Sequence, residues 1–174
     1  MSAIPQDLGS IKAFAFDVDG VLSRSVTTLG ADGIPQRTGN VKDGFALRMA
    51  ISHGYRVAVI TGGNSPQTRL RMEYLGITDY YAESRDKVAD MEHFLAKYGL
   101  KAEEAIYVGD DMPDVAVMRF VGIAAAPRDA AYEALDAAQY ISPCNGGEGV
   151  ARDVIEQVMR AQGKWHTEQI NLDW

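Results

Sequence analysis

Short apolar runs alternate with longer segments of helical character along most of this chain. We expect strands at residues 11–16, 56–60, 105–108 and 122–125, and helices at residues 44–53, 65–75, 86–98, 113–120 and 149–162. Ser65 before Pro66 is typical of a helix start, and Gly99 is typical of a helix end. Strands that alternate with helices form a parallel sheet. We therefore predict one α/β domain over residues 1–174, with a Rossmann-like parallel sheet covered by helices on both faces.

Residues 23–40 interrupt this alternation directly after the first expected strand. Residues 26–29 and 34–38 have the composition of short strands, and the sequence GADG between them is a hairpin turn signal. We predict a small β-hairpin flap beside the first strand. The last helix is followed by a polar C-terminal tail at residues 163–174.

The charge balance narrows the range of partners. The chain of 174 residues has 17 Lys and Arg against 24 Asp and Glu, for a net charge of -7. An acidic surface repels nucleic-acid backbones and anionic membranes, so we expect neither as a partner. The single cysteine, Cys144, cannot form an internal disulfide, and no apolar run is long enough to span a bilayer. These features indicate a cytoplasmic protein that acts on a small molecule.

Polar side chains follow each of the first three expected strands. They are Asp17 and Asp19 after the first strand, Thr61 after the second, and Asp110, Asp111 and Asp114 after the third. Thr61 is followed by Gly62 and Gly63, which supply flexible backbone amides. The carboxyl ends of parallel strands meet at one edge of a sheet, where ligands gather in open α/β folds. We expect these residues to converge there, together with Lys87 at the start of a helix.

The carboxylates fit a Mg²⁺ site that also binds a phosphate. Mg²⁺ prefers oxygen ligands, which the side chains of Asp17 and Asp110 and the carbonyl of Asp19 would supply. The Asp17 carboxylate would attack phosphorus and form an aspartyl-phosphate, which water then hydrolyses. Asp19 would carry the proton, first to the leaving oxygen and then from the attacking water.

The remaining residues of this edge fit the phosphoryl group. Thr61 and the Gly62 amide would hold phosphoryl oxygens, and Lys87 would neutralise their charge. Asp111 and Asp114 form a supporting acidic cluster. Each motif alone has a simpler interpretation as a turn, a loop or a helix start, so the hypothesis depends on their joint occurrence in this order.

The sequences DVDGVL, ITGG and GDDMPD, with Lys87 between the second and the third, resemble in order the four motifs of the haloacid dehalogenase superfamily. The second aspartate of DVDGVL points to its phosphatases. The sequences NVKDG, GGEG and AQGK, with Arg48 and Arg71, resemble a narrower branch, the 3-deoxy-D-manno-octulosonate 8-phosphate phosphatases, which lack a large cap domain.

This resemblance implies a hairpin flap in place of a cap. It also implies a homotetramer in which the flap and the C-terminal tail contact neighbouring subunits, so that a tail can close a neighbour's site. The substrate contacts implied are Asn40, Val41, Lys42, Asp43, Gly44, Arg48 and Arg71.

Gly63 departs from the pattern of this branch. The octulosonate phosphatases usually carry a basic residue directly after the Thr-Gly of the second motif, and the related 9-phosphate enzymes tend to carry glutamate. Gly63 has no side chain, which leaves Lys42, Arg48 and Arg71 as candidates to meet the distal carboxylate of the substrate.

We therefore interpret the chain as a Mg²⁺-dependent phosphomonoester hydrolase acting on an α-keto sugar acid phosphate. The first choice of substrate is 3-deoxy-D-manno-octulosonate 8-phosphate, a precursor in lipopolysaccharide synthesis. The alternatives are a phosphatase for the 9-phosphate of a sialic-acid-like nonulosonate, and a non-catalytic oligomerisation or regulatory module of the same fold. A dehalogenase would share the Asp17 nucleophile but would need neither Asp19 nor the metal.

Overall fold

The central sheet is parallel throughout. This computed structural model describes residues 3–165, and its strands are β1 (Ala13–Phe16), β2 (Arg56–Ile60), β3 (Asp79–Tyr81), β4 (Ala105–Val108), β5 (Ile123–Ala126) and β6 (Tyr140–Ile141). Their order across the sheet is β3-β2-β1-β4-β5-β6, and every neighbouring pair is parallel. This is the strand order of a Rossmann-like fold, so the predicted fold class is confirmed.

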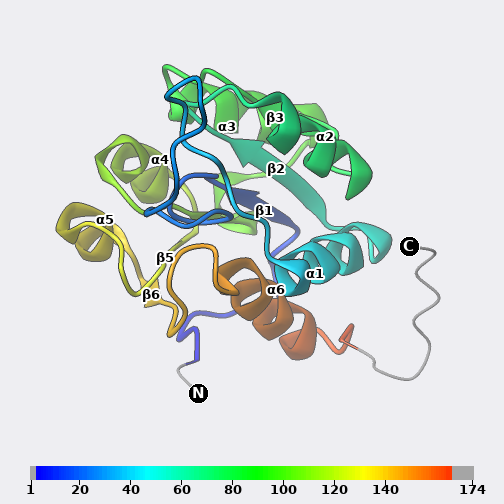
Figure 1. Cartoon of the computed structure of the whole chain (residues 1–174). Coiled ribbons are helices and arrows are strands. Elements are labelled where there is room, and N and C mark those ends of the chain that lie inside the picture. Colours follow the sequence, from blue (N-terminus) through cyan, green and yellow to red (C-terminus); the bar gives the residue numbers. More distant parts are fainter. Residues whose placement is uncertain (1–2, 166–174) are drawn as a thin grey trace.

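Helices cover both faces of the sheet (Figure 1). They are α1 (Val41–Ser52), α2 (Pro66–Tyr74), α3 (Lys87–Tyr98), α4 (Val115–Phe120), α5 (Tyr132–Ala137) and α6 (Val150–Ala161). Helices α1, α2 and α6 contribute to the core on one face, and α3, α4 and α5 to the core on the other. Short 3₁₀ turns precede β4 and α4.

The strand β1 shows how the sequence divides the core between two faces. Successive side chains of a strand point to opposite faces. Phe14 and Phe16 therefore pack on the side of α1 and α6, whereas Ala13 and Ala15 pack on the side of α3 and α4. All four side chains are fully buried, which explains why the run reads as continuously apolar.

Side-chain caps fix where the helices begin. Ser65 accepts a hydrogen bond from the Thr68 amide and precedes Pro66, as the sequence predicts. Helix α1 starts at Val41, three residues earlier than expected, because Asn40 caps it by accepting from the amides of the second and third helical residues.

Three short elements were not predicted, namely β3, α5 and β6. The flap also differs from expectation, because residues 26–29 and 34–38 do not form two regular strands. One antiparallel bridge joins Leu29 to Pro35, next to a hydrogen bond of 2.8 Å from the Gly30 amide to the Ile34 carbonyl. On the other side of this bridge the Gln36 amide donates to the Thr28 carbonyl at 2.9 Å, so Pro35 stands at a position where the hairpin needs no amide hydrogen.

The two ends of the flap meet beside the end of β1. The Thr38 amide donates to Ser23 Oγ at 2.9 Å, and the Arg24 amide donates to Thr38 Oγ1 at 3.1 Å. In Figure 1 the flap is the loop that leaves β1 before the chain enters α1. Of the predicted tail, residues 163–165 are described, and Trp165 packs edge-on against Phe45 of α1. The rest of the tail lies outside the described residues.

None of the helices in residues 3–165 combines the length and the apolar character that crossing a membrane requires.

Candidate active site

The carboxyl ends of β1, β2 and β4 lie at one level of the sheet. Phe16, the last residue of β1, is in register with Val59 of β2 and Val108 of β4. The Asp17 amide continues this pattern by donating to the Val108 carbonyl at 3.0 Å. The residues that follow the three strands therefore share one edge, as the sequence analysis expected.

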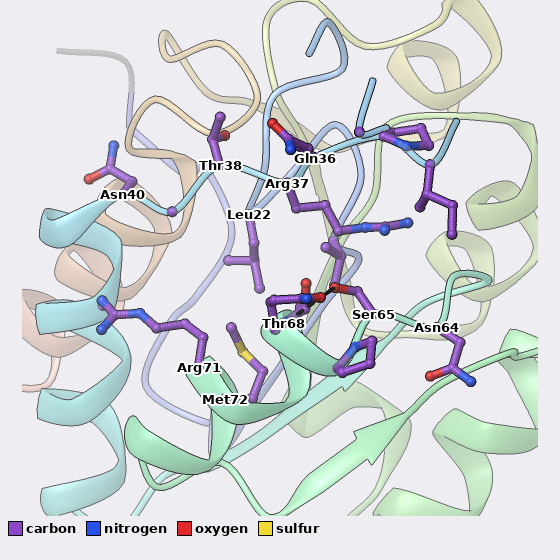
Figure 2. A pocket seen from close by; sticks show the side chains of 18 of the residues that line it. Leu22, Gln36, Arg37, Thr38, Asn40, Asn64, Ser65, Thr68, Arg71 and Met72 are labelled. Carbon is purple, nitrogen blue, oxygen red and sulfur yellow. Dashed lines mark hydrogen bonds between the residues drawn. The ribbon is translucent and has the colours of Figure 1, made fainter. Parts of the chain in front are cut away.

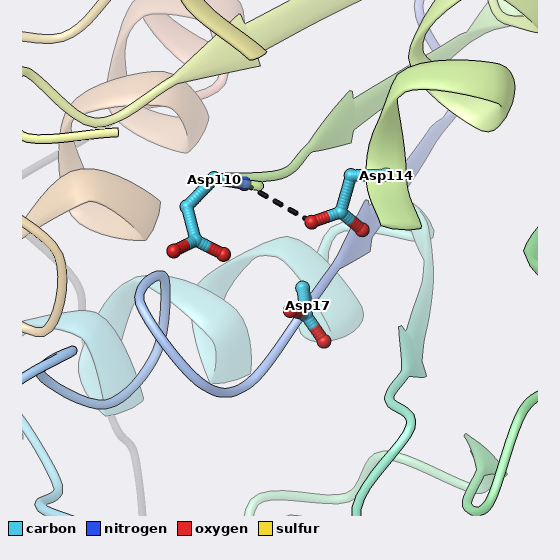
Figure 3. Close-up of side chains that lie close together, drawn as sticks. All are labelled: Asp17, Asp110 and Asp114. Atoms are coloured by element: carbon cyan, nitrogen blue, oxygen red, sulfur yellow. Dashed lines mark hydrogen bonds between the residues drawn. The ribbon is translucent and has the colours of Figure 1, made fainter. Parts of the chain in front are cut away.

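Three carboxylates gather at this edge. Asp17, Asp110 and Asp114 each offer an oxygen, and these oxygens all lie within 4.8 Å of one another (Figure 3). The two oxygens of Asp114 have protein partners. One accepts from Lys87 Nζ and from the Tyr107 hydroxyl, both at 2.6 Å, and the other accepts from the Asp110 amide at 3.1 Å.

Lys87 is the cation of this cluster. It is the first residue of α3, which Asp86 caps, and its Nζ lies 3.1 Å from Asp17 Oδ1 and 2.6 Å from Asp114 Oδ1. Burial alone would lower the pKa of the Lys87 ammonium, but the carboxylates of Asp17 and Asp114 outweigh burial and raise it. Lys87 is therefore a fixed positive charge in contact with Asp17.

One lysine does not balance three carboxylates. Burial, followed by repulsion from Asp114, raises the pKa of Asp17 from 3.8 to about 7. Burial, followed by repulsion from Asp17 and Asp114, raises the pKa of Asp110 from 3.8 to about 8. The site thus has an excess of negative charge and hard oxygen donors, which fits a divalent cation such as Mg²⁺.

Glycines allow the loops around this cluster to approach closely. Gly20 has φ of 85°, and a Cβ at this position would collide with the carboxylate of Asp110. A Cβ at Gly146 would collide with the carbonyl of Gly20, and the Gly147 amide donates to the Val21 carbonyl at 2.8 Å. The backbone of the GGEG segment therefore packs directly against the loop that follows β1.

The loop after β2 is held by backbone hydrogen bonds. Thr61 is buried, its amide donates to the Tyr81 carbonyl at 2.9 Å, and its Oγ1 accepts from the Gly63 amide at 3.2 Å. Gly62 is exposed at this loop. Thr61 and Gly62 thus follow the end of β2, the strand that pairs with β1 and so lies next to Asp17.

A pocket of about 910 Å³ opens beside this edge, between the flap, the start of α1 and the start of α2 (Figure 2). Four of the predicted substrate contacts line it, namely Asn40, Asp43, Gly44 and Arg71. The other three, Val41, Lys42 and Arg48, are not among the described residues that line this pocket.

Asp43 has a second role that the sequence did not reveal. Its Oδ1 accepts a hydrogen bond of 2.7 Å from the Arg152 amide in the first turn of α6, and burial raises the pKa of its carboxyl to about 6. Its Oδ2 is buried without a hydrogen-bond partner among the described atoms. Asp43 thus joins α1 to α6 while it also lines the pocket.

Sequence reasoning missed Arg37. This flap residue also lines the pocket, and its guanidinium contacts the carboxylate of Asp19. The signal that could have indicated it is Gly63, because a position without a side chain leaves room for a side chain from elsewhere. The approach of the flap to this position depends on tertiary structure, which the motif pattern does not contain.

Known proteins share both the sequence and the fold. The family model for haloacid dehalogenase-like hydrolases matches residues 64–154. The 3-deoxy-D-manno-octulosonate 8-phosphate phosphatase of Escherichia coli strain K12 is 36% identical over 155 residues, covering 89% of this chain and 82% of that protein.

Two solved structures extend the comparison. The crystal structure of the phosphatase of the same name from Yersinia pestis has a TM-score of 0.87 and 34% identity, covering 91% of this chain and 86% of that one. The enzyme of this name from Moraxella catarrhalis, solved with a magnesium ion, a phosphate ion and a KDO molecule, has a TM-score of 0.86 and 31% identity, covering 92% of each chain.

The sequence matches extend over most of both proteins, and the fold agrees over the same span. The Moraxella catarrhalis structure contains a magnesium ion, and Asp17, Asp110 and Asp114 form a group of carboxylates that could hold a divalent metal here. The chain therefore belongs to the haloacid dehalogenase-like hydrolases, as a phosphatase similar to the 3-deoxy-D-manno-octulosonate 8-phosphate phosphatases.

Proposed function

We propose that this phosphatase hydrolyses 3-deoxy-D-manno-octulosonate 8-phosphate with Mg²⁺, in the synthesis of the lipopolysaccharide precursor. The observation that carries the proposal is the buried cluster of Asp17, Asp110, Asp114 and Lys87, next to a pocket that contains the cation Arg71. A phosphate group and a sugar acid carboxylate are the two charged ends of such a substrate, and the site has a place for each.

Asp17 is the nucleophile in this mechanism. Its carboxylate attacks phosphorus, the ester P–O bond breaks, and the bond's electron pair goes to the leaving oxygen, which takes a proton from Asp19. Asp17, Asp110 and the Asp19 carbonyl would hold Mg²⁺, which would supply positive charge to the phosphoryl oxygens. Water then attacks the aspartyl-phosphate, Asp19 accepts its proton, and phosphate leaves with Asp17 restored.

The neighbouring residues hold the phosphoryl group during both steps. Thr61 and the Gly62 amide donate hydrogen bonds to its oxygens. Lys87, whose ammonium lies 3.1 Å from Asp17 Oδ1, favours the charged form of Asp17 against the burial that raises its pKa. Asp114 holds the Lys87 ammonium in turn, and its second oxygen accepts from the Asp110 amide.

The rest of the substrate lies in the pocket. Arg71 is placed to bind the carboxylate, because it lines the pocket and stands over Gly44 at the start of α1. The amide of Asn40 and the hydroxyls of Ser65 and Thr68 line the same space and suit a polyol chain. We assign no direct contact to Val41, Lys42 or Arg48.

We also propose that the enzyme works in the cytoplasm as a homotetramer. Large apolar side chains of the flap are exposed, with 87% of Val26 and 67% of Leu29 accessible. Exposed apolar side chains grouped on one segment suit an interface between subunits.

The experiment that tests the function measures phosphate release from 3-deoxy-D-manno-octulosonate 8-phosphate, from nonulosonate 9-phosphates and from common sugar phosphates, with Mg²⁺ and with EDTA. We predict preference for the octulosonate ester, no turnover in EDTA, and a loss of at least about 1,000-fold in kcat for Asp17→Asn, since the nucleophile is gone.

The matched control is Asp136→Asn. Asp136 is an exposed aspartate of α5 that pairs with Arg119 at the surface, and its replacement should leave the rate as in the wild type. Preference for another ester would contradict the proposed substrate but would leave the mechanism unchanged. Turnover that survives EDTA or Asp17→Asn would contradict the mechanism itself.

A further inference from the structure

Arg37 reaches from the flap to the proposed proton carrier. Its Nε donates to Asp19 Oδ1 at 2.9 Å and its Nη2 donates to Asp19 Oδ2 at 2.8 Å, so both oxygens of the carboxylate are engaged. Only 13% of the Arg37 side chain is exposed, against 48% for Asp19. Figure 2 shows Arg37 extending from the flap into the pocket, whereas Arg71 extends from α2. A parallel pair of charge-assisted hydrogen bonds fixes the orientation of a carboxylate as well as its position.

Gly63 provides the space that this contact needs. A Cβ placed on Gly63 would lie 2.5 Å from Arg37 Nη2, 3.4 Å from Arg37 Cζ and 3.5 Å from Asp19 Oδ2. Carbon and nitrogen do not approach to 2.5 Å without bonding, so any side chain here would push the guanidinium away. The loop after β1, the loop after β2 and the flap therefore meet at a single contact of three residues.

We propose that Arg37 is a positioning residue that holds the Asp19 carboxylate for proton transfer, and that glycine at position 63 is required for this. The proposal rests on the proposed function, which makes Asp19 the proton carrier. As the ester P–O bond breaks, the proton moves from Asp19 to the leaving oxygen and Asp19 becomes a carboxylate. The two N–H groups of Arg37 match the two oxygens of that carboxylate, and they hold it until it accepts the proton of the attacking water.

The test compares two esters that differ in their need for this proton. A sugar phosphate releases an alkoxide, which must be protonated as it leaves, whereas p-nitrophenyl phosphate releases a stable phenolate. We expect Arg37→Ala to lower kcat for the sugar acid phosphate by about 10- to 100-fold, within the range of general acid catalysis. The loss with p-nitrophenyl phosphate should be at least about tenfold smaller, because that leaving group needs no acid.

Gly63→Val gives a second and independent variant. It leaves Arg37 in the chain but displaces its guanidinium, so it should show the same dependence on the leaving group as Arg37→Ala. The double variant should lose no more than about twofold beyond either single one, because both changes break the same contact. Arg37→Lys should recover only part of the rate, since an ammonium cannot engage both oxygens in parallel.

The control is Arg24→Ala. Arg24 is another flap arginine, but it pairs with Glu148 at the surface, with 57% of its side chain exposed. It should keep the wild-type rate with both esters, and thermal unfolding of each variant would show that the fold is intact.

Three results would overturn the proposal. Equal losses with both esters would make Arg37 a phosphate-binding residue. A faster Arg37→Ala enzyme would make the contact inhibitory, and additive losses in the double variant would make Gly63 unrelated to Arg37. If the wild type prefers a different sugar phosphate, only the proposed substrate is overturned. That ester also releases an alkoxide, so the role of Arg37 can be tested with it in the same way.

Discussion

Asp17, Asp110 and Asp114 place three carboxylates around the single ammonium of Lys87. Each of these groups was identified in the sequence by its position directly after a strand or at a helix start. The sequence could not give the balance of charge among them, because that depends on burial and on distances between strand ends. The raised pKa values of Asp17 and Asp110 follow first from burial and then from repulsion between these carboxylates.

This crowding predicts how pH and metal affect stability. Folding raises the pKa of Asp17 from 3.8 to about 7 and that of Asp110 from 3.8 to about 8. Between these values the folded protein holds protons that the unfolded chain has released. Without metal, the free energy of unfolding should therefore fall as pH rises from about 4 to about 8. A divalent cation replaces those protons, so its stabilising effect should grow over the same range.

Thermal unfolding in EDTA and in Mg²⁺, at about pH 6 and about pH 8, would measure this effect. The gap between the two melting temperatures should widen at the higher pH. Asp110→Asn should reduce this widening of the gap, because one of the two titrating carboxyls is then absent. An equal gap at both values of pH would show that the carboxylates are already charged in the metal-free protein.

Arg37 marks the limit of sequence reasoning at this scale. Asp17 and Asp19 belong to one short motif, so their proximity is local and predictable. Arg37 lies in a different segment, and its contact with Asp19 exists only because the flap folds back beside β1. The sequence shows that position 63 has no side chain, but it does not show that the guanidinium of Arg37 fills the space.

At the scale of elements, α6 depends on a cap from another helix. Its own N-cap residue is Gly149, which has no side chain to accept from the first turn. Asp43 of α1 does so instead, since its Oδ1 accepts from the Arg152 amide at 2.7 Å. The α1–α6 contact, which is made largely by apolar core residues, thus includes a hydrogen bond of the buried Asp43 side chain.

We predict that Asp43→Ala lowers the free energy of unfolding by about 1–3 kcal/mol, the cost of losing a cap and leaving a buried amide without an acceptor. Urea unfolding followed by circular dichroism would measure it. Asp136→Ala, at an exposed position, is the control. A loss of activity in Asp43→Ala with unchanged stability would instead support the direct substrate contact that the sequence implies.

The elements that were predicted and those that were missed differ in composition and length. Strands β1, β2 and β4 are apolar and continuous, so the sequence reveals them. Strand β3 begins with Asp79, a buried aspartate that accepts from Lys97 Nζ and the Tyr98 hydroxyl, both at 2.6 Å. Such a residue is acceptable in a strand only because α3 supplies its partners, and that is tertiary information. Strand β6 has two residues and α5 has six, and such short segments are too short to show the hydrophobic periodicity of a strand or a helix.

At the scale of the whole molecule, the exposed flap predicts assembly. Leu29 and Val26 are both largely exposed, at 67% and 87%. If four subunits meet through the flap, light scattering should give about four times the chain mass of 18.9 kDa. Leu29→Lys should reduce the mass, because a charge would be buried in the interface. Lys12→Leu, at an exposed residue of a different surface, should not. A single-chain mass for the wild type would contradict this expectation.

The flap is one continuous segment, residues 23–40, whereas the reacting groups come from strand ends distributed along the chain. Changes in that segment that leave Arg37 in contact with Asp19 can therefore accumulate without moving Asp17, Asp110 or Lys87. In evolution, such a separation lets related enzymes change their substrate selectivity while they keep the same reaction chemistry. Exchange of the flap between relatives is the corresponding route for engineering new selectivity.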